Sequence, residues 1–136
     1  MLRISKQADY GIVLLSYFAQ KELGTTLTAR DLSRASNLPL PTVAKILKLL
    51  AHGGVLQSHR GVHGGYQLAR RAREVTGASI VEGLEGPIGL GECIPGVKKV
   101  CLHAPRCPVK GPLHRLNAIV RETLEGLSLR ELVTSI

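Results

Sequence analysis

Apolar residues recur at helical spacing in three segments of the N-terminal half of the chain. The first segment runs from Lys6 to Glu22, and Gly24 follows it as a stop signal. Its apolar positions are Ala8, Ile12, Leu15 and Ala19. Thr28 with Asp31 resembles a capping box that opens a short second helix. A turn of alternating Leu and Pro then leads into a third helix, expected from Pro41 to His52.

The third predicted helix has two chemically different faces. At about 100° per residue, one face is an apolar stripe and the opposite face carries cations. The stripe consists of Val43, Ile46, Leu47 and Leu50, and the opposite face of Pro41, Lys45, Lys48 and His52. Two short helices joined by a tight turn, the second with cations outward, are typical of a helix-turn-helix whose second helix enters a DNA major groove. The residues expected to contact DNA there are Pro41, Thr42, Lys45 and Lys48.

Two strand-like runs, residues 55–60 and 66–70, flank a glycine-rich turn directly after the third helix. A hairpin in this place is typical of a wing, and its tip carries Arg60, His63 and Gly64. An arginine at such a tip is well shaped to enter a minor groove. The alternative is a flexible surface hairpin, but the basic helix beside it favours DNA contact. The sequence therefore predicts a mainly α fold, a winged helix-turn-helix with a two-stranded β wing.

Three further helices are expected in the C-terminal half. Residues 79–86 form a short one that opens with a capping box at Ser79. A long helix follows the cysteine-containing loop, and its apolar stripe consists of Leu113, Leu116, Val120, Leu124 and Leu127. This stripe could pack on its own domain, but its length and position favour a dimer seam. The expected parts are a DNA-binding domain (1–76), a short helix with a cysteine-rich cluster-binding loop (77–110), and a dimerisation helix with a last short helix (111–136).

The formal net charge is +8, and its distribution is uneven. Residues 1–75 hold eleven Lys and Arg against four Asp and Glu, and no acidic residue lies between Asp31 and Glu74. Such a stretch suits a polyanion, although a solvated basic face is the plainer alternative. Combined with the predicted helix-turn-helix, the charge favours double-stranded DNA as a partner.

Several classes of function are not expected from this sequence. No stretch approaches the roughly twenty apolar residues of a membrane span, so no membrane partner is expected. An odd number of cysteines and no secretory leader favour the reducing cytoplasm. Neither a catalytic triad nor a glycine-rich phosphate loop is present, so we expect neither an enzyme nor a small-molecule substrate.

All three cysteines, Cys93, Cys101 and Cys107, fall within fifteen residues. Structural zinc sites usually bring their ligands as closely spaced pairs, a disulfide would leave one thiol over, and a catalytic thiol would need a base. Soft thiolates bind iron, and the glycines and prolines of the loop let it wrap a bulky inorganic core. An iron–sulfur cluster therefore fits best, and three incidental cysteines are the alternative.

The helix-turn-helix, the wing sequence RGVHGGYQLAR, the three cysteines and the long C-terminal helix together resemble the Rrf2 family of winged-helix transcription regulators. The resemblance covers essentially the whole chain. It is strongest to the cluster-binding branch, which includes regulators of iron–sulfur cluster assembly and a nitric-oxide-sensing repressor. It implies a homodimeric, redox-sensing regulator that carries a 2Fe-2S or 4Fe-4S cluster and controls genes of the SUF iron–sulfur assembly system.

The family pattern also bears on the fourth cluster ligand. Where the Isc-type regulator has a histidine three residues after its third cysteine, this chain has Lys110. In the nitric-oxide-sensing branch an aspartate near the start of the first helix ligates the cluster of the other subunit, and Asp9 matches that place. The resemblance thus implies Asp9 as the fourth ligand across a dimer. The remaining local candidates near the cysteines are His103, ranked second, and His114, ranked third. Ala44 matches a position where the Isc-type regulator has a glutamate, so that regulator's DNA preference does not carry over.

A second hypothesis comes from another class of protein. The chain would then be a cluster-free thiol redox or metal-handling protein that uses the winged domain as a scaffold. Only a regulator requires Lys45, Lys48 and Arg60 for retention on duplex DNA, so these cations discriminate between the two hypotheses.

Overall fold

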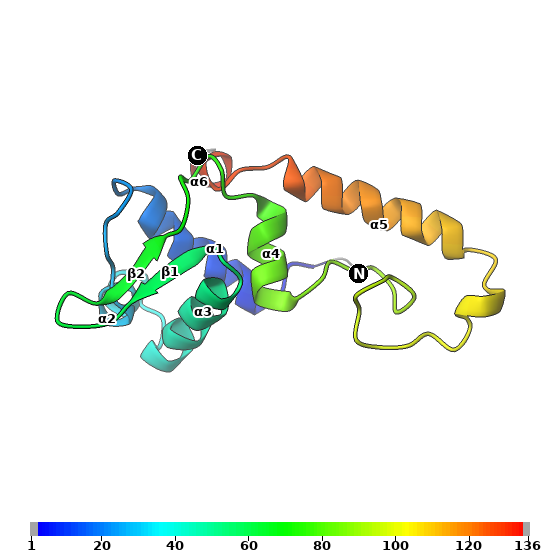
Figure 1. Ribbon diagram of the computed structural model, residues 1–136, viewed down its shortest axis with the longest axis horizontal. Helices are drawn as coiled ribbons and strands as arrows, with labels where there is room; N and C mark the ends of the chain where they lie inside the picture. The colour runs from blue at the N-terminus through cyan, green and yellow to red at the C-terminus, as the bar shows by residue number, and fades with distance from the viewer. Residues whose placement is uncertain (1–2, 135–136) are drawn as a thin grey trace.

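The structure, a computed structural model, describes residues 3–134; Met1, Leu2, Ser135 and Ile136 lie outside the described residues. The elements in order are α1 (Lys6–Ala19), α2 (Ala29–Ser36), α3 (Leu40–His52), β1 (Leu56–His59), β2 (Gly65–Leu68), α4 (Gly77–Glu85), the 3-10 turn η1 (Ala104–Arg106), α5 (Lys110–Glu125) and α6 (Leu129–Thr134). Figure 1 shows the winged part at one end and α5 projecting from it, with the loop between α4 and α5 folded beneath α5. The prediction of a mainly α winged-helix fold is confirmed.

Capping side chains set where several helices begin. The Ser5 hydroxyl accepts the N–H of Ala8 at the start of α1. At α2 the predicted capping box is present, because Thr28 and Asp31 each accept the other's backbone N–H at 3.1 and 3.0 Å. The backbone N–H of Thr28 is the main reason that the pKa of Asp31 is lowered, since it stabilises the ionised carboxylate.

Two predicted helix boundaries were wrong. Helix α4 begins at Gly77 rather than residue 79, because the capping box is formed by Thr76 and Ser79. Ser79 is therefore the third residue of α4 instead of its cap. Helix α1 ends at Ala19, three residues before the predicted end. The chain turns there so that residues 25–28 can run beside the wing.

The hydrophobic core lies between α1, α2, α3, α4, α6 and the base of the wing. The predicted apolar face of α3 is buried in it, and each of its side chains is at most 2% exposed. These side chains are Val43, Ile46, Leu47 and Leu50. Other core members are Leu14, Leu15, Leu32, Leu56, Ile80 and Leu129. The core thus fixes α3 by its apolar face and leaves the opposite face free.

The two wing strands pair antiparallel, with Leu56 opposite Leu68 and His59 opposite Gly65. Residue Leu27 pairs with Tyr66 on the other side of β2 through two backbone hydrogen bonds of 2.9 Å. This close approach requires a glycine next to it, because a Cβ on Gly65 would lie 2.7 Å from the Leu27 carbonyl oxygen. Strand β2 is therefore paired along both edges, with β1 on one side and Leu27 on the other.

None of the described helices is both long and apolar enough to cross a membrane.

Candidate nucleic-acid interface and cysteine loop

The outward face of α3 is a solvent-facing basic surface. Lys45, Lys48 and His52 are exposed, and the small side chains of Thr42 and Ala44 between them are half-buried. A shallow depression on this face is lined by Pro41, Ala44, Lys45, Lys48, Leu49 and His52. The two lysines take part in none of the ion pairs found among residues 3–134, so their charge is available to a ligand.

The turn before α3 is fixed by local hydrogen bonds. Asn37 ends α2 in the left-handed conformation, at φ 59°, which asparagine tolerates better than most residues. The Ser33 hydroxyl donates to the Leu38 carbonyl oxygen at 2.6 Å, and the Tyr17 hydroxyl donates to that of Ala35 at 3.0 Å. These contacts tie the turn to α1 and α2 and so fix the orientation of α3 relative to them.

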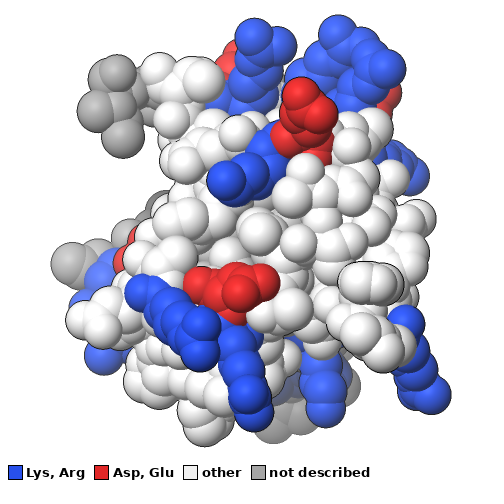
Figure 2. All heavy atoms as spheres, turned by 90° about the vertical axis from the view of Figure 1, so that its left-hand side faces the viewer, with Lys and Arg blue, Asp and Glu red and all other residues white. Residues whose placement is uncertain are grey.

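The tip of the wing projects freely from the body. Arg60 and His63 are exposed, and Val62 between them is 99% exposed. Gly64 has a structural role, since a Cβ there would lie 2.6 Å from the His59 carbonyl oxygen. In Figure 2, which views this end of the molecule, Lys and Arg side chains project at several points around its edge, and the acidic areas are smaller.

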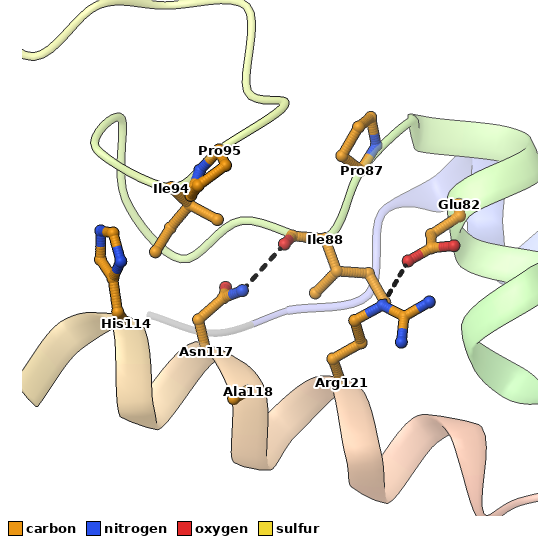
Figure 3. Close-up of a pocket in the computed structure, with 9 residues that line it drawn as sticks. All are labelled: Glu82, Pro87, Ile88, Ile94, Pro95, His114, Asn117, Ala118 and Arg121. Carbon is orange, nitrogen blue, oxygen red and sulfur yellow. Dashed lines mark hydrogen bonds and ion pairs between the residues drawn. The ribbon is translucent and has the colours of Figure 1, made fainter.

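The cysteine loop, residues 86–109, is held to the molecule by α5. Asn117 is the one buried polar side chain among the described residues. Its amide accepts the N–H of Leu90 at 2.9 Å and donates to the Ile88 carbonyl oxygen at 3.1 Å. His114 lies one turn earlier, and its Nε2 donates to the Cys93 carbonyl oxygen at 3.0 Å. Figure 3 shows these side chains projecting from α5 toward the loop, where they line a pocket with Ile94.

The three thiols are free and half-exposed. Cys101 and Cys107 flank the η1 turn, in which the Cys101 carbonyl oxygen accepts the N–H of Ala104 at 3.3 Å. Across residues 3–134, however, no three His, Cys, Asp or Glu side chains are grouped closely enough to hold a metal ion. The loop therefore supplies the predicted sulfur donors without gathering them at one point.

The predicted fourth ligands lie in different places. Asp9 is exposed in the first turn of α1. His103 is exposed beside the η1 turn, whereas His114 is already bound to the backbone of Cys93. Neither Asp9 nor His103 forms a metal-binding group with the cysteines in the described part of this single chain.

The predicted dimer stripe on α5 divides into two parts. Leu113, Val120 and Leu124 are half-buried, and Leu124 packs over Gly77 of α4. Leu116 remains 47% exposed, and the neighbouring Ile119, which the stripe did not include, is 50% exposed. The outward part of α5 is therefore an apolar surface that its own chain leaves uncovered.

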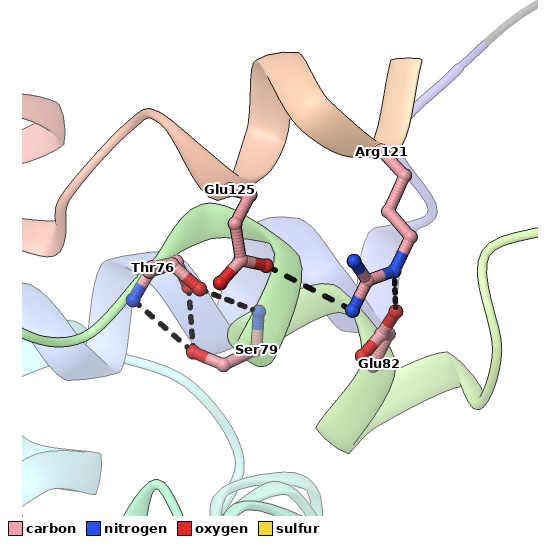
Figure 4. A network of polar contacts seen from close by, with 5 residues as sticks. All are labelled: Thr76, Ser79, Glu82, Arg121 and Glu125. Carbon is pink, nitrogen blue, oxygen red and sulfur yellow. Dashed lines mark hydrogen bonds and ion pairs between the residues drawn. The ribbon is translucent and has the colours of Figure 1, made fainter. Parts of the chain in front are cut away.

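Two polar contacts on α5 were not foreseen from the sequence. Asn117 interrupts the apolar stripe between Leu113 and Val120, and a polar residue at such an inward position signals a buried hydrogen-bonding role. Arg121 donates through Nε to Glu82 of α4 at 2.9 Å, and its other side reaches Glu125 at 3.8 Å (Figure 4). The hydrogen bond to Glu82 is the main reason that the pKa of Arg121 is raised.

A recognition helix with an exposed basic face, followed by an anchored wing with an arginine at its tip, defines a winged-helix DNA-binding protein. The chain matches the Rrf2 family, described as "Iron-dependent Transcriptional regulator", over residues 4–135. It belongs to this family, and it is a DNA-binding transcription regulator. Regulation of this kind is a non-enzymatic role, which confirms the prediction that the chain is not an enzyme.

Related proteins align with nearly the whole chain. The HTH-type transcriptional regulator NsrR of Halalkalibacterium halodurans is 25% identical over 98% of this chain and 92% of its own length. Protein aau3 of Rhizobium meliloti is 30% identical over 97% of this chain and 85% of its own length.

Solved structures support the same fold. CymR, the global cysteine regulator of B. subtilis, superimposes with a TM-score of 0.73 and 26% identity, covering 100% of this chain and 99% of that one. IscR of T. potens superimposes with a TM-score of 0.69 at 21% identity, over 97% of this chain and 86% of that one. At this identity the second likeness speaks for the fold alone.

Proposed function

We propose that this regulator is a homodimeric, cytoplasmic repressor whose operator binding is controlled by an iron–sulfur cluster. The observation that carries the proposal is the confinement of three free, half-exposed thiols to one loop, which Asn117 and His114 of α5 hold in place. The description of the family as iron-dependent supports it. The proposed cluster-binding part is 77–110, between the DNA-binding part (1–76) and the dimerisation part (111–136).

The donor set fits such a cluster chemically. Cys93, Cys101 and Cys107 would hold it through thiolates, the ligands that iron–sulfur clusters take. Lys98, Lys99 and Arg106 are exposed in the same loop and would offset the negative charge of a thiolate-bound cluster. When bound, the cluster would supply a redox-active, oxidant-sensitive group in this loop.

Asp9 of the partner subunit is the fourth ligand that we propose, with His103 as the alternative. Asp9 is exposed on its own chain, so its carboxylate is available to a second molecule. His114 is the weaker candidate, because its Nε2 is bound to the Cys93 carbonyl oxygen.

The DNA-binding surface that we propose consists of α3 and the wing. Pro41, Thr42, Lys45 and Lys48 would face a major groove, and Arg60 and His63 an adjacent minor groove. Gly64 would act by shaping the turn that presents these two side chains. A dimer formed through α5 would place two such surfaces on two half-sites. The proposed targets, SUF iron–sulfur assembly genes, rest on the sequence resemblance.

A second candidate is a cluster-free regulator that senses thiol oxidation. The likeness to CymR favours it, because CymR is named as a cysteine regulator and the Staphylococcus aureus CymR has been solved in an oxidised form. Iron and acid-labile sulfide in the purified protein would distinguish the two candidates.

The proposed function is tested by measuring DNA affinity with and without the cluster. A high-affinity operator is first selected from random duplexes with anaerobically purified protein. Its affinity is then compared before and after chelation of the iron, with Cys93→Ser/Cys101→Ser/Cys107→Ser as a cluster-free reference. We expect the chelated protein to bind like the reference and at least about fivefold differently from the loaded protein. Equal affinity of all three samples would contradict the proposal.

A further inference from the structure

The C-terminal end of the recognition helix α3 touches α4 backbone to backbone. Gly53, the residue that ends α3, has φ −79° and ψ 0°, a conformation open to any L residue. A glycine is needed there for another reason: a Cβ on Gly53 would lie 2.7 Å from the Cα of Gly83 in α4. A side chain at position 53 therefore has no room beside the backbone of α4.

The opposite face of α4 is held by α5. Arg121 donates to Glu82, the neighbour of Gly83, at 2.9 Å. Gly77, the first residue of α4, also lies close to α5. A Cβ on Gly77 would be 3.0 Å from the Leu124 carbonyl oxygen. Figure 4 shows Arg121 and Glu125 of α5 above α4. Helix α4 is thus fixed between α3 and α5.

The C-terminus of α4 leads directly into the cysteine loop. Gly86 ends the helix at φ +85°, and its N–H donates to the Glu82 carbonyl oxygen at 2.9 Å. Just before it, the Leu84 carbonyl oxygen accepts from the Gln7 side chain at 2.7 Å, and Glu85 accepts from the Ser5 hydroxyl. The end of α4 is thus joined to the cysteine loop on one side and to the start of α1 on the other.

We propose that α4 transmits the state of the cysteine loop to the recognition helix, and that the contact between Gly53 and Gly83 is the joint. Side chains between packed helices absorb small displacements by changing rotamer, whereas two backbones in contact cannot. A shift of α4 would therefore move the end of α3 with it. This inference rests on the proposed function, because it needs a loop whose state changes.

The two glycines give a matched pair of variants. Gly53→Ala would force α3 and α4 apart, since its Cβ meets backbone at 2.7 Å. Gly83→Ala adds the same methyl group from the other side, where it would lie 3.8 Å from the Gly53 Cα and from Val55 Cγ2, an ordinary contact. The control also suits its position in α4, since alanine favours helix more than glycine does.

The measurement is the ratio of operator affinities before and after removal of the cluster, for wild type and both variants. We expect a ratio of at least about fivefold for wild type and Gly83→Ala, falling to within about twofold of one for Gly53→Ala. A wild-type ratio of one would contradict the proposed function itself. If wild type shows the expected ratio and Gly53→Ala shows the same ratio, the proposed role of the contact between Gly53 and Gly83 is wrong, while the proposed function stands. The same conclusion follows if Gly53→Ala and Gly83→Ala lose the ratio equally.

If Gly53→Ala folds but no longer binds DNA, its affinity ratio cannot be measured, and a second measurement without DNA is used instead. Hydrogen exchange of the backbone amides from Leu50 to Val55, without DNA, should change in wild type when the cluster is removed. We expect no such change in Gly53→Ala, and an unaltered change would overturn the joint. If Gly53→Ala does not fold, Glu82→Ala provides a substitute, because it removes the surface contact between α4 and α5. The ratio of operator affinities should be smaller in Glu82→Ala than in wild type. Glu125→Ala is its control. An unchanged ratio in Glu82→Ala would then overturn the proposal.

Discussion

Lys45 and Lys48 are the residues of α3 for which we propose the most direct contact with DNA. Both are exposed on α3 and free of ion pairs within residues 3–134, and Ile46 and Leu47 between them are buried. Replacing both by alanine should weaken operator binding and reduce its salt dependence, since each lost phosphate contact lowers the slope by about one unit. Gel shifts at several salt concentrations measure both effects.

The control for this prediction is Lys21→Ala, which removes an exposed lysine that lies just beyond α1 and outside the α3 surface. Its affinity and salt slope should match the wild type. A double variant of Lys45 and Lys48 with the wild-type slope would show that DNA contacts another surface.

Asp9 is the second residue with a specific expected role. Asp9→Ala should alter or destabilise the cluster while leaving the cluster-free protein dimeric, because the side chain is exposed and forms no part of the core. The visible spectrum and the lifetime of the cluster under anaerobic conditions measure the effect. A normal spectrum and lifetime in Asp9→Ala, together with loss in His103→Ala, would assign the ligand to His103.

At the scale of elements, helix α5 has two different faces. Its inward face holds the cysteine loop and α4 through Asn117 and Arg121, and its outward face exposes Leu116 and Ile119. We propose that the outward face, with Leu113, Val120 and Leu124 at its edge, forms the dimer seam. Leu116→Glu with Ile119→Glu should then give monomers, because two buried carboxylates would face each other across the seam.

Light scattering of the cluster-free protein measures this change in mass. Arg115→Glu places the same side chain on an exposed polar position of α5 and should leave the dimer intact. An intact dimer in the Leu116 and Ile119 variant would move the seam to another surface.

The elements also show how far the sequence could predict the structure. The buried and exposed faces of α3 could be predicted from the sequence, because apolar residues at regular helical spacing all lie on one face. These residues are Val43, Ile46, Leu47 and Leu50, and all four are buried. The predicted start of α4 was wrong, because the sequence offers two possible capping boxes, Thr76 with Ser79 and Ser79 with Glu82. The structure forms the first of them. Glu82 turned out to pair with Arg121, a residue 39 positions away.

At the scale of the whole molecule, the cysteine loop and the DNA-binding surface belong to separate parts that α4 and α5 connect (Figure 1). This connection could not be predicted from the sequence, because the contact between Gly53 and Gly83 depends on how two helices cross. The three cysteines likewise predicted sulfur ligands within one loop. Their spacing could not predict the positions of the three sulfur atoms relative to one another. As we propose, both a cluster and a second subunit are needed to bring the three sulfurs together.

The most direct test of the account is the visible absorption spectrum of the anaerobically purified protein, with iron and acid-labile sulfide measured on the same sample. The account predicts absorption of an iron–sulfur cluster with both elements present, and loss of all three signals in Cys93→Ala, Cys101→Ala and Cys107→Ala. A colourless wild-type protein without iron or sulfide, or a spectrum unchanged by these substitutions, would contradict it.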